Sequence, residues 1–183
     1  MLCPSSSTGT DVKLALVLLA AVLLLTGCGG TATYSSTDLG CSFKYPKGFE
    51  LQSELPTKKA ATATFIDGRT DQGQWVTEAS FTVAAYAGTS GEPSVDDAKA
   101  VAKKALGSSF SRFTQARTVT VGDMRGIVVG VIYWAGGEDW VDETWMLAGP
   151  RTYLVTLSSP AADWPSLAPR LREVPMSLRP RTD

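Results

Sequence analysis

The chain has 183 residues, a formal net charge of −1 at pH 7 and no histidine. Without a basic stripe there is no electrostatic case for nucleic-acid binding, and without histidine there is no His-based triad, Cys–His dyad or His metal site. No Walker loop, dinucleotide fingerprint or Gly-x-Ser-x-Gly elbow occurs. The sequence therefore predicts no catalytic residue, no metal site and no cofactor.

An unbroken apolar run, Leu14 to Leu25, is followed by Thr26, Gly27 and Cys28. The run is shorter than the ~20 apolar residues that a transmembrane helix needs, and it matches the apolar core of a signal peptide. A buried core helix and an ordinary secretory signal with an Ala-x-Ala cleavage site are the alternatives. However, polar residues follow the run, with no second apolar element. The segment resembles a bacterial lipoprotein signal, with Leu25, Thr26 and Gly27 as the lipobox and Cys28 as the lipidated residue.

This resemblance implies three segments: a signal peptide over 1–27, a tether over 28–39 that starts at lipidated Cys28, and a globular domain over 40–183. Gly, Ser and Thr dominate the tether and bury little apolar area, which predicts a flexible segment. The implied location is the extracytoplasmic face of the cell membrane. Signal peptides begin with a positive charge, but the first basic residue is Lys13. We therefore hypothesise that translation starts at Val12 rather than at Met1.

The cysteines also constrain the fold. Cys3 would leave with the signal and Cys28 would carry the lipid, so only Cys41 remains. No intramolecular disulfide is then available, and the domain must be held together by its core. Cys41 stands in a predicted strand and is interpreted as a small buried hydrophobe.

The first half of the domain reads as β-structure. Alternation and turn residues predict a strand over Cys41–Tyr45, a turn at Pro46–Gly48, a return hairpin strand over Phe49–Gln52, a strand over Ala61–Ile66, a polar loop over Asp67–Gly73 and a long strand over Trp75–Tyr86.

A helix is predicted over Ser94–Leu106, where the apolar residues recur at helical spacing. Ser94 is a suitable N-cap residue. The first turn contains two Asp residues, whose negative charges are stabilised by the positive N-terminal end of the helix dipole. Gly107 is placed to end the helix.

The second half returns to strands and closes with a helix. The segment 127–134 is apolar at nearly every position, which predicts a central strand covered on both faces, and Gly130 within it indicates a close neighbour or a bulge. The remaining predicted elements are strands over Thr118–Val121, Met124–Trp134, Trp140–Leu147 and Thr152–Leu157, and a short or kinked helix over Ala161–Val174.

This order of elements resembles the PsbP/Mog-type fold and the actinobacterial LpqN-like lipoproteins. The residues that carry the resemblance are Gly40–Phe49, the mid-chain amphipathic helix, Leu154–Ala161 and Asp163-Trp164. The resemblance implies an α+β fold, an antiparallel β-sheet flanked by helices in an α-β-α sandwich. It also implies a function in binding or assembly rather than in catalysis. The family has no active site whose residues could be matched to positions of this sequence. The chain departs from the family pattern at Pro175–Leu178, where relatives usually continue the final helix.

Two groups of residues are candidates for a binding site. The acidic cluster Glu138, Asp139, Asp142 and Glu143 is interpreted as a solvated hairpin tip in preference to a cation or catalytic site. The aromatic residues Tyr133, Trp134, Trp140 and Trp145 are close in sequence on adjacent predicted strands. They are interpreted mainly as core, with an aromatic groove for an apolar ligand or a partner segment as the alternative.

Three functional hypotheses follow, all without nucleic acid. The first is a non-catalytic, lipid-anchored binding or assembly module of the bacterial cell envelope that contacts an envelope protein. The second is a carrier of a lipid or small hydrophobic ligand in a sheet–helix pocket. The third and weakest is a carboxylate-dependent hydrolase, which would need several inward-facing carboxylates in a cleft.

Overall fold

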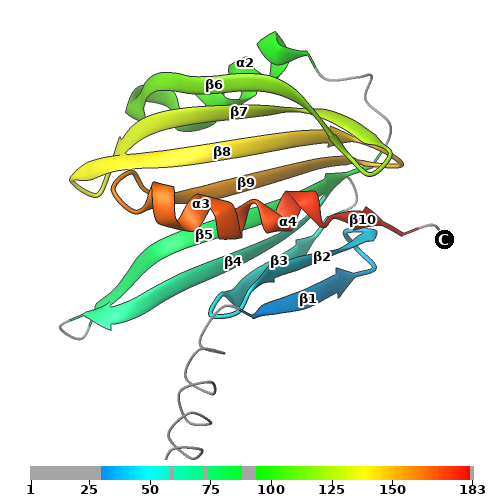
Figure 1. Cartoon of the computed structure of the whole chain (residues 1–183), viewed down its shortest axis with the longest axis horizontal. Coiled ribbons are helices and arrows are strands. Elements are labelled where there is room, and N and C mark those ends of the chain that lie inside the picture. Colours follow the sequence, from blue (N-terminus) through cyan, green and yellow to red (C-terminus); the bar gives the residue numbers. More distant parts are fainter. Residues whose placement is uncertain (1–29, 58–59, 72–73, 88–93, 182–183) are drawn as a thin grey trace, which may run out of the picture. The chain divides into compact units, whose positions relative to one another are not determined.

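Two antiparallel sheets pack against each other in the computed structural model, which describes residues 30–57, 60–71, 74–87 and 94–181 (Figure 1). These elements belong to a compact unit that begins at Thr31. The larger sheet has seven strands in the spatial order β3 (Glu50–Pro56), β4 (Ala60–Asp71), β5 (Gln74–Tyr86), β9 (Thr152–Pro160), β8 (Glu138–Ala148), β7 (Met124–Ala135) and β6 (Phe110–Val121). The α+β fold predicted from the sequence, an antiparallel sheet flanked by helices, is confirmed.

The smaller sheet has the order β1 (Thr31–Ser36), β2 (Cys41–Pro46) and β10 (Arg179–Pro180). The prediction of a flexible tether up to residue 39 is wrong from Thr31 onward, because β1 pairs with β2 along its whole length. The ring of Tyr34 packs against those of Phe43 and Phe65, and Leu39 is fully buried. The composition of this segment did not predict a strand, although Thr and Ser are compatible with a strand that has one exposed face. Such a strand is stabilised by its pairing and by a few buried side chains.

The hairpin predicted between Cys41–Tyr45 and Phe49–Gln52 does not form. Both edges of β2 are already occupied, by β1 and by β10. The turn after Pro46 instead carries the chain from the small sheet to the large one, where β3 pairs with β4. The pairing of β2 with β1 and β10, and of β3 with β4, therefore determines the sheet to which each of the two strands belongs, and the turn between them does not.

The main core lies between the two sheets. It contains the stacked rings of Phe65 and Phe81, 4.6 Å apart, with Phe43 packed edge-on against both. The C-terminal helices α3 (Trp164–Leu171) and α4 (Glu173–Met176) close the same side and bury Leu171 and Val174 (Figure 1). The single predicted helix over Ala161–Val174 is therefore two short ones.

The opposite face of the large sheet carries α2 (Val95–Leu106), which packs on β6 and β7. Ser94 caps it by accepting a hydrogen bond from the Asp97 backbone N–H, and Gly107 ends it with φ +54°. The predicted helix, its cap and its end are confirmed. Ala98 and Ala102 pack against Ile127, Val129 and Val131 in a second, smaller core.

Strands β4, β6 and β7 differ from prediction in extent or position. Strand β4 continues through the expected polar loop to Asp71, with an irregularity at Asp67/Gly68, and residues 72–73 lie outside the described residues. Strand β6 begins at Phe110 rather than at Thr118. Strand β7 is buried on both faces as predicted, but it lies next to the sheet edge rather than at the centre. A Cβ at Gly130 would clash with Thr114 Oγ1, beside a bulge in β6, so the predicted close approach is confirmed.

Candidate functional site

The four aromatic residues singled out from the sequence do not form one surface. Trp145 is buried on the face of the large sheet that meets the small sheet, and Trp134 points to the same face but is 57% exposed. Tyr133 and Trp140 are cross-strand partners on the opposite face. The structure therefore divides these residues between two faces and brings no two tryptophans together as a groove.

The lipidation residue Cys28 and the lipobox Leu25, Thr26 and Gly27 lie outside the described residues. Among the helices of the described part of the chain, none combines the length and apolar character that membrane crossing requires. Cys41 is buried as predicted, and burial raises the pKa of its thiol to about 12.

A fully buried carboxylate organises the face that carries α3 and α4. Glu143 accepts hydrogen bonds from Gln115 Nε2 at 2.6 Å, from Trp145 Nε1 at 2.9 Å and from Arg172 Nε at 2.9 Å. The Arg172 guanidinium binds both carboxylate oxygens, and its pKa is raised chiefly by hydrogen bonding to Glu143. Because a buried charge needs a partner and several donors, this network fixes β6, β8 and the α3–α4 junction to one another.

Two arginines lie over tryptophan rings beside this network. The Arg117 guanidinium carbon is 5.9 Å from the Trp145 ring centroid, and that of Arg172 is 5.8 Å from the Trp164 ring centroid. Both distances fit cation–π contact. The Trp145 ring contacts the guanidinium group of Arg117, which is exposed at the surface, whereas the Arg172 guanidinium is already bound to Glu143.

A groove that we call the arginine groove runs between these side chains and is partly open to solvent. Its volume is about 510 Å³, and it is lined by Arg117, Thr118, Val119, Thr120, Trp145, Arg172 and Met176. Two guanidinium groups above an apolar floor can hold a carboxylate or phosphate that is attached to an apolar or extended chain.

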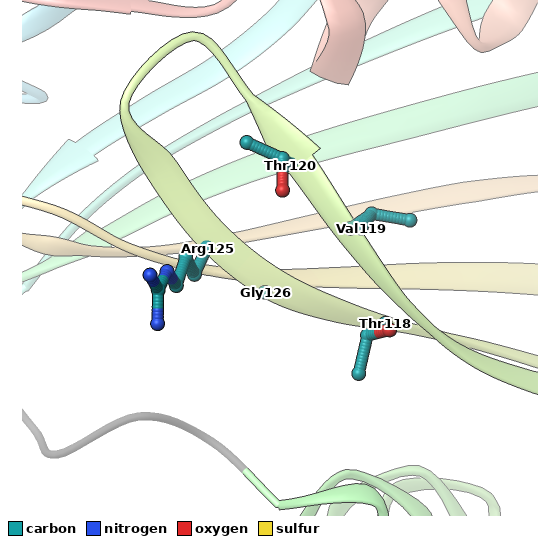
Figure 2. Close-up of a pocket in the computed structure, with 5 residues that line it drawn as sticks. All are labelled: Thr118, Val119, Thr120, Arg125 and Gly126. Carbon is teal, nitrogen blue, oxygen red and sulfur yellow. The ribbon is translucent and has the colours of Figure 1, made fainter.

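A second groove, the hairpin groove, lies over the β6–β7 hairpin. It has a volume of about 350 Å³ and is lined by Thr118, Val119, Thr120, Arg125 and Gly126. Figure 2 shows the three β6 residues on one strand of the hairpin and Arg125 on the other. The two grooves share Thr118 to Thr120, so both lie along the same stretch of β6. No carboxylate is among the residues that line either one.

A polar cluster lies on the opposite face of the large sheet. The Tyr133 hydroxyl and Ser158 Oγ are 3.1 Å apart, and both lie beside Asp142. Burial raises the pKa of Asp142 above its ordinary value, and burial together with the Asp142 charge raises the pKa of Tyr133 to about 12. In the described ranges, no three acidic, cysteine or histidine side chains are arranged to hold a metal ion.

The interpretation of the acidic cluster as a solvated hairpin tip fits Glu138 and Asp139, which are exposed. It is wrong for Glu143, which is fully buried, and for Asp142, whose carboxyl is largely buried. The sequence position of Glu143 could have predicted its burial, because Glu143 lies on the same face of its strand as Val141 and Trp145, which are buried. Such a position predicts a buried charge with a partner. Only the tertiary structure shows that the partner is Arg172.

No protein-family model matches the chain, and no curated protein matches it in sequence. Solved structures do match. Cyanobacterial PsbP (CyanoP) from Synechocystis sp. PCC 6803 is 14% identical, with a TM-score of 0.60 over 97% of this chain and 99% of that one. The Saccharomyces cerevisiae Ran-binding protein Mog1p is 12% identical, with a TM-score of 0.58 over 82% and 95% of the two chains.

The chain has the PsbP/Mog-type fold. LpqN of Mycobacterium tuberculosis, described as involved in cell envelope biogenesis, also matches, at 12% identity and a TM-score of 0.49 over 88% of this chain and 96% of that one. The similarity to PsbP and to Mog1p establishes the fold, as the sequence resemblance predicted. The two grooves along β6 are thus features of this chain's own side chains on a PsbP/Mog-type framework.

Proposed function

We propose that the chain is a lipid-anchored, extracytoplasmic lipoprotein that acts as a non-catalytic binding or assembly module of the bacterial cell envelope. The proposal joins an N-terminal export and lipidation signal ending at Cys28 to a PsbP/Mog-type domain whose surface carries grooves. It includes a membrane partner, through the lipid, and a protein partner in the envelope.

The observation that carries the proposal is the spacing between Cys28 and the first strand. Only Gly29 and Gly30 separate Cys28 from Thr31, where β1 begins. Three residue steps span at most ~11 Å when fully extended. A lipid on Cys28 would therefore hold the folded domain directly at the headgroups, which suits a module that meets its partner at the membrane surface.

The chemistry of the described residues supports binding rather than catalysis. Glu143 is engaged by three hydrogen-bonding side chains, so it is not placed to exchange protons with a substrate. The space between the sheets is filled by the packed rings of Phe43, Phe65 and Phe81 rather than by a ligand. The arginine and hairpin grooves are partly open to solvent, which suits a protein segment better than an enclosed lipid.

The lipidation arm of the proposal is tested by metabolic labelling with an alkyne fatty acid in a bacterial host. The full chain should be labelled and should fractionate with membranes, and Cys28→Ser should lose both properties. A Cys41→Ser variant is the matched control and should keep both. Equal labelling of wild type and Cys28→Ser would contradict the anchor.

The carrier alternative is tested by native mass spectrometry of the full chain released from detergent. A module is expected to give the mass of the lipidated chain alone. A stoichiometric co-purifying hydrophobic mass would favour the carrier.

A further inference from the structure

Strand β6 forms one edge of the large sheet, and among the described residues no strand pairs with its outer side. Its first half is irregular, with register shifts at Phe110/Arg112 and at Phe113/Gln115. From Ala116 to Val121 the pairing with β7 is regular, residue for residue. An edge strand of this kind presents a row of backbone N–H and C=O groups to any extended chain.

The two halves differ in how well they can accept another strand. Bulges are a common device that prevents edge-to-edge pairing, because they twist the edge and interrupt the ladder. The half that contains Arg112 is interrupted in this way. The half that contains Arg117 keeps a regular ladder, so it remains a template for β-augmentation.

Both faces beside the regular half are hollowed. The arginine groove lies on the side of Trp145 and Arg172, and it includes Thr118 to Thr120. The hairpin groove includes the same three residues and extends to Arg125 (Figure 2). Successive side chains of a strand point to opposite faces. A strand added to residues 116–121 would therefore place alternate side chains toward the two grooves.

The charged residues around these grooves indicate which kind of peptide segment would bind there. Three arginines (Arg117, Arg125 and Arg172) line the grooves, and β6 itself contains two arginines and no acidic residue. Arg172 is balanced by Glu143, whereas Arg117 is exposed and contacts the Trp145 ring. The positive charge that this edge presents to solvent is therefore that of Arg117. It complements carboxylate side chains.

We propose that residues 116–121 of β6 accept an extended, acidic segment of a partner protein as an additional strand of the large sheet. The backbone of the edge supplies the pairing, and the arginine groove supplies the selectivity for carboxylates. This inference rests on the proposed function as a binding module, and it specifies the surface and the chemical class of the partner segment.

The test uses the full chain in detergent and the peptide acetyl-Val-Glu-Val-Glu-Val-Glu-Val-amide, titrated by calorimetry. Saturable binding is expected, and Arg117→Glu is expected to weaken it at least tenfold. Arg112→Glu is the matched control, because it makes the same charge change at an exposed position of the same strand but in the bulged half. It should change the affinity less than threefold.

Two further measurements separate strand addition from simple charge attraction. Amide hydrogen exchange within 116–121 should slow at least tenfold at saturation, and a peptide methylated on alternate backbone nitrogens should bind at least tenfold more weakly. A peptide with Lys in place of Glu should prefer Arg117→Glu over wild type, which also shows that this variant is folded.

The inference is overturned by no saturable binding at millimolar peptide, by equal effects of Arg117→Glu and Arg112→Glu, or by self-association of the chain through β6 in place of peptide binding. Fatty-acid labelling of Cys28 is measured in parallel. Normal labelling without peptide binding defeats only this inference, whereas loss of the lipid anchor defeats the proposed function.

Discussion

At the scale of single residues, Glu143 shows how a charge is tolerated inside this domain. Removing a carboxylate from water costs several kcal/mol, and here three different side chains supply the compensating donors. The donors come from β6, β8 and the residue between α3 and α4. The network therefore determines which elements meet at the arginine groove.

Replacing Arg172 by Ala should lower the free energy of unfolding by about 3 kcal/mol, the low end of the range for breaking a buried pair. The low end applies because Gln115 and Trp145 still donate to Glu143, and because the Arg172 side chain is 37% exposed. Urea denaturation measures the loss. Arg170→Ala, in the last turn of α3, should change stability by about 0.5 kcal/mol or less. Equal losses in the two variants would contradict the account.

Asp142 should give the stability a defined pH dependence. Burial raises its pKa in the folded state above the ordinary value of 3.8, so the folded protein binds more protons than the unfolded chain between the two pKa values. The stability contributed by protonated Asp142 is complete below the unfolded pKa and is lost as pH rises through the folded pKa. Asp142→Asn should therefore be stabilising at pH 7, and this advantage should disappear at the acid end.

Urea denaturation from pH 3 to pH 8 measures the effect of Asp142→Asn. Asp123→Asn, at the exposed β6–β7 turn, provides the comparison and should follow the wild-type curve. A constant difference between Asp142→Asn and wild type at every pH would contradict the assignment.

At the scale of elements, β1 shows that amino-acid composition alone does not predict whether a segment forms a strand. Its Thr and Ser residues indicated a flexible segment, but Tyr34 and the pairing with β2 make it a strand of the small sheet. Helix α2 is the opposite case, because its capping residue, charge distribution and apolar spacing all act within one segment. Helix α2 was therefore predicted with its bounds, whereas β1, which depends on its pairing with β2, was missed.

Tyr34→Ala should lower the free energy of unfolding by about 2 kcal/mol, less than the 3–5 kcal/mol of a fully buried aromatic ring, because Tyr34 is only half-buried. Thermal or urea unfolding of the full chain measures it. Tyr86→Ala is the comparison, since Tyr86 is 44% exposed and belongs to neither hydrophobic cluster. A Tyr34→Ala loss no larger than that of Tyr86→Ala would show that β1 does not contribute to the core.

At the scale of the whole molecule, the two sheets share one aromatic core and leave the outer edge of β6 exposed. Cys41, the one cysteine among the described residues, is free and packs in this core, where burial raises the pKa of its thiol to about 12. The exposed edge and its arginines are the basis for the proposed partner binding. The short distance in sequence between Cys28 and β1 is the basis for the proposed position at the membrane surface.

The sequence by itself determined helix α2, the buried strand β7 and the β8–β9 hairpin, because each depends on alternation, helical spacing or turn residues within one segment. The general fold was predicted from the resemblance to the PsbP/Mog-type family. Tertiary structure decided the rest. The partner of Glu143 lies 29 residues away, and the Lys44 backbone N–H donates to Ser177 Oγ across 133 residues of chain. Local patterns show that a side chain is buried but not which distant group satisfies it. The grooves along β6 therefore emerge only when distant segments pack together.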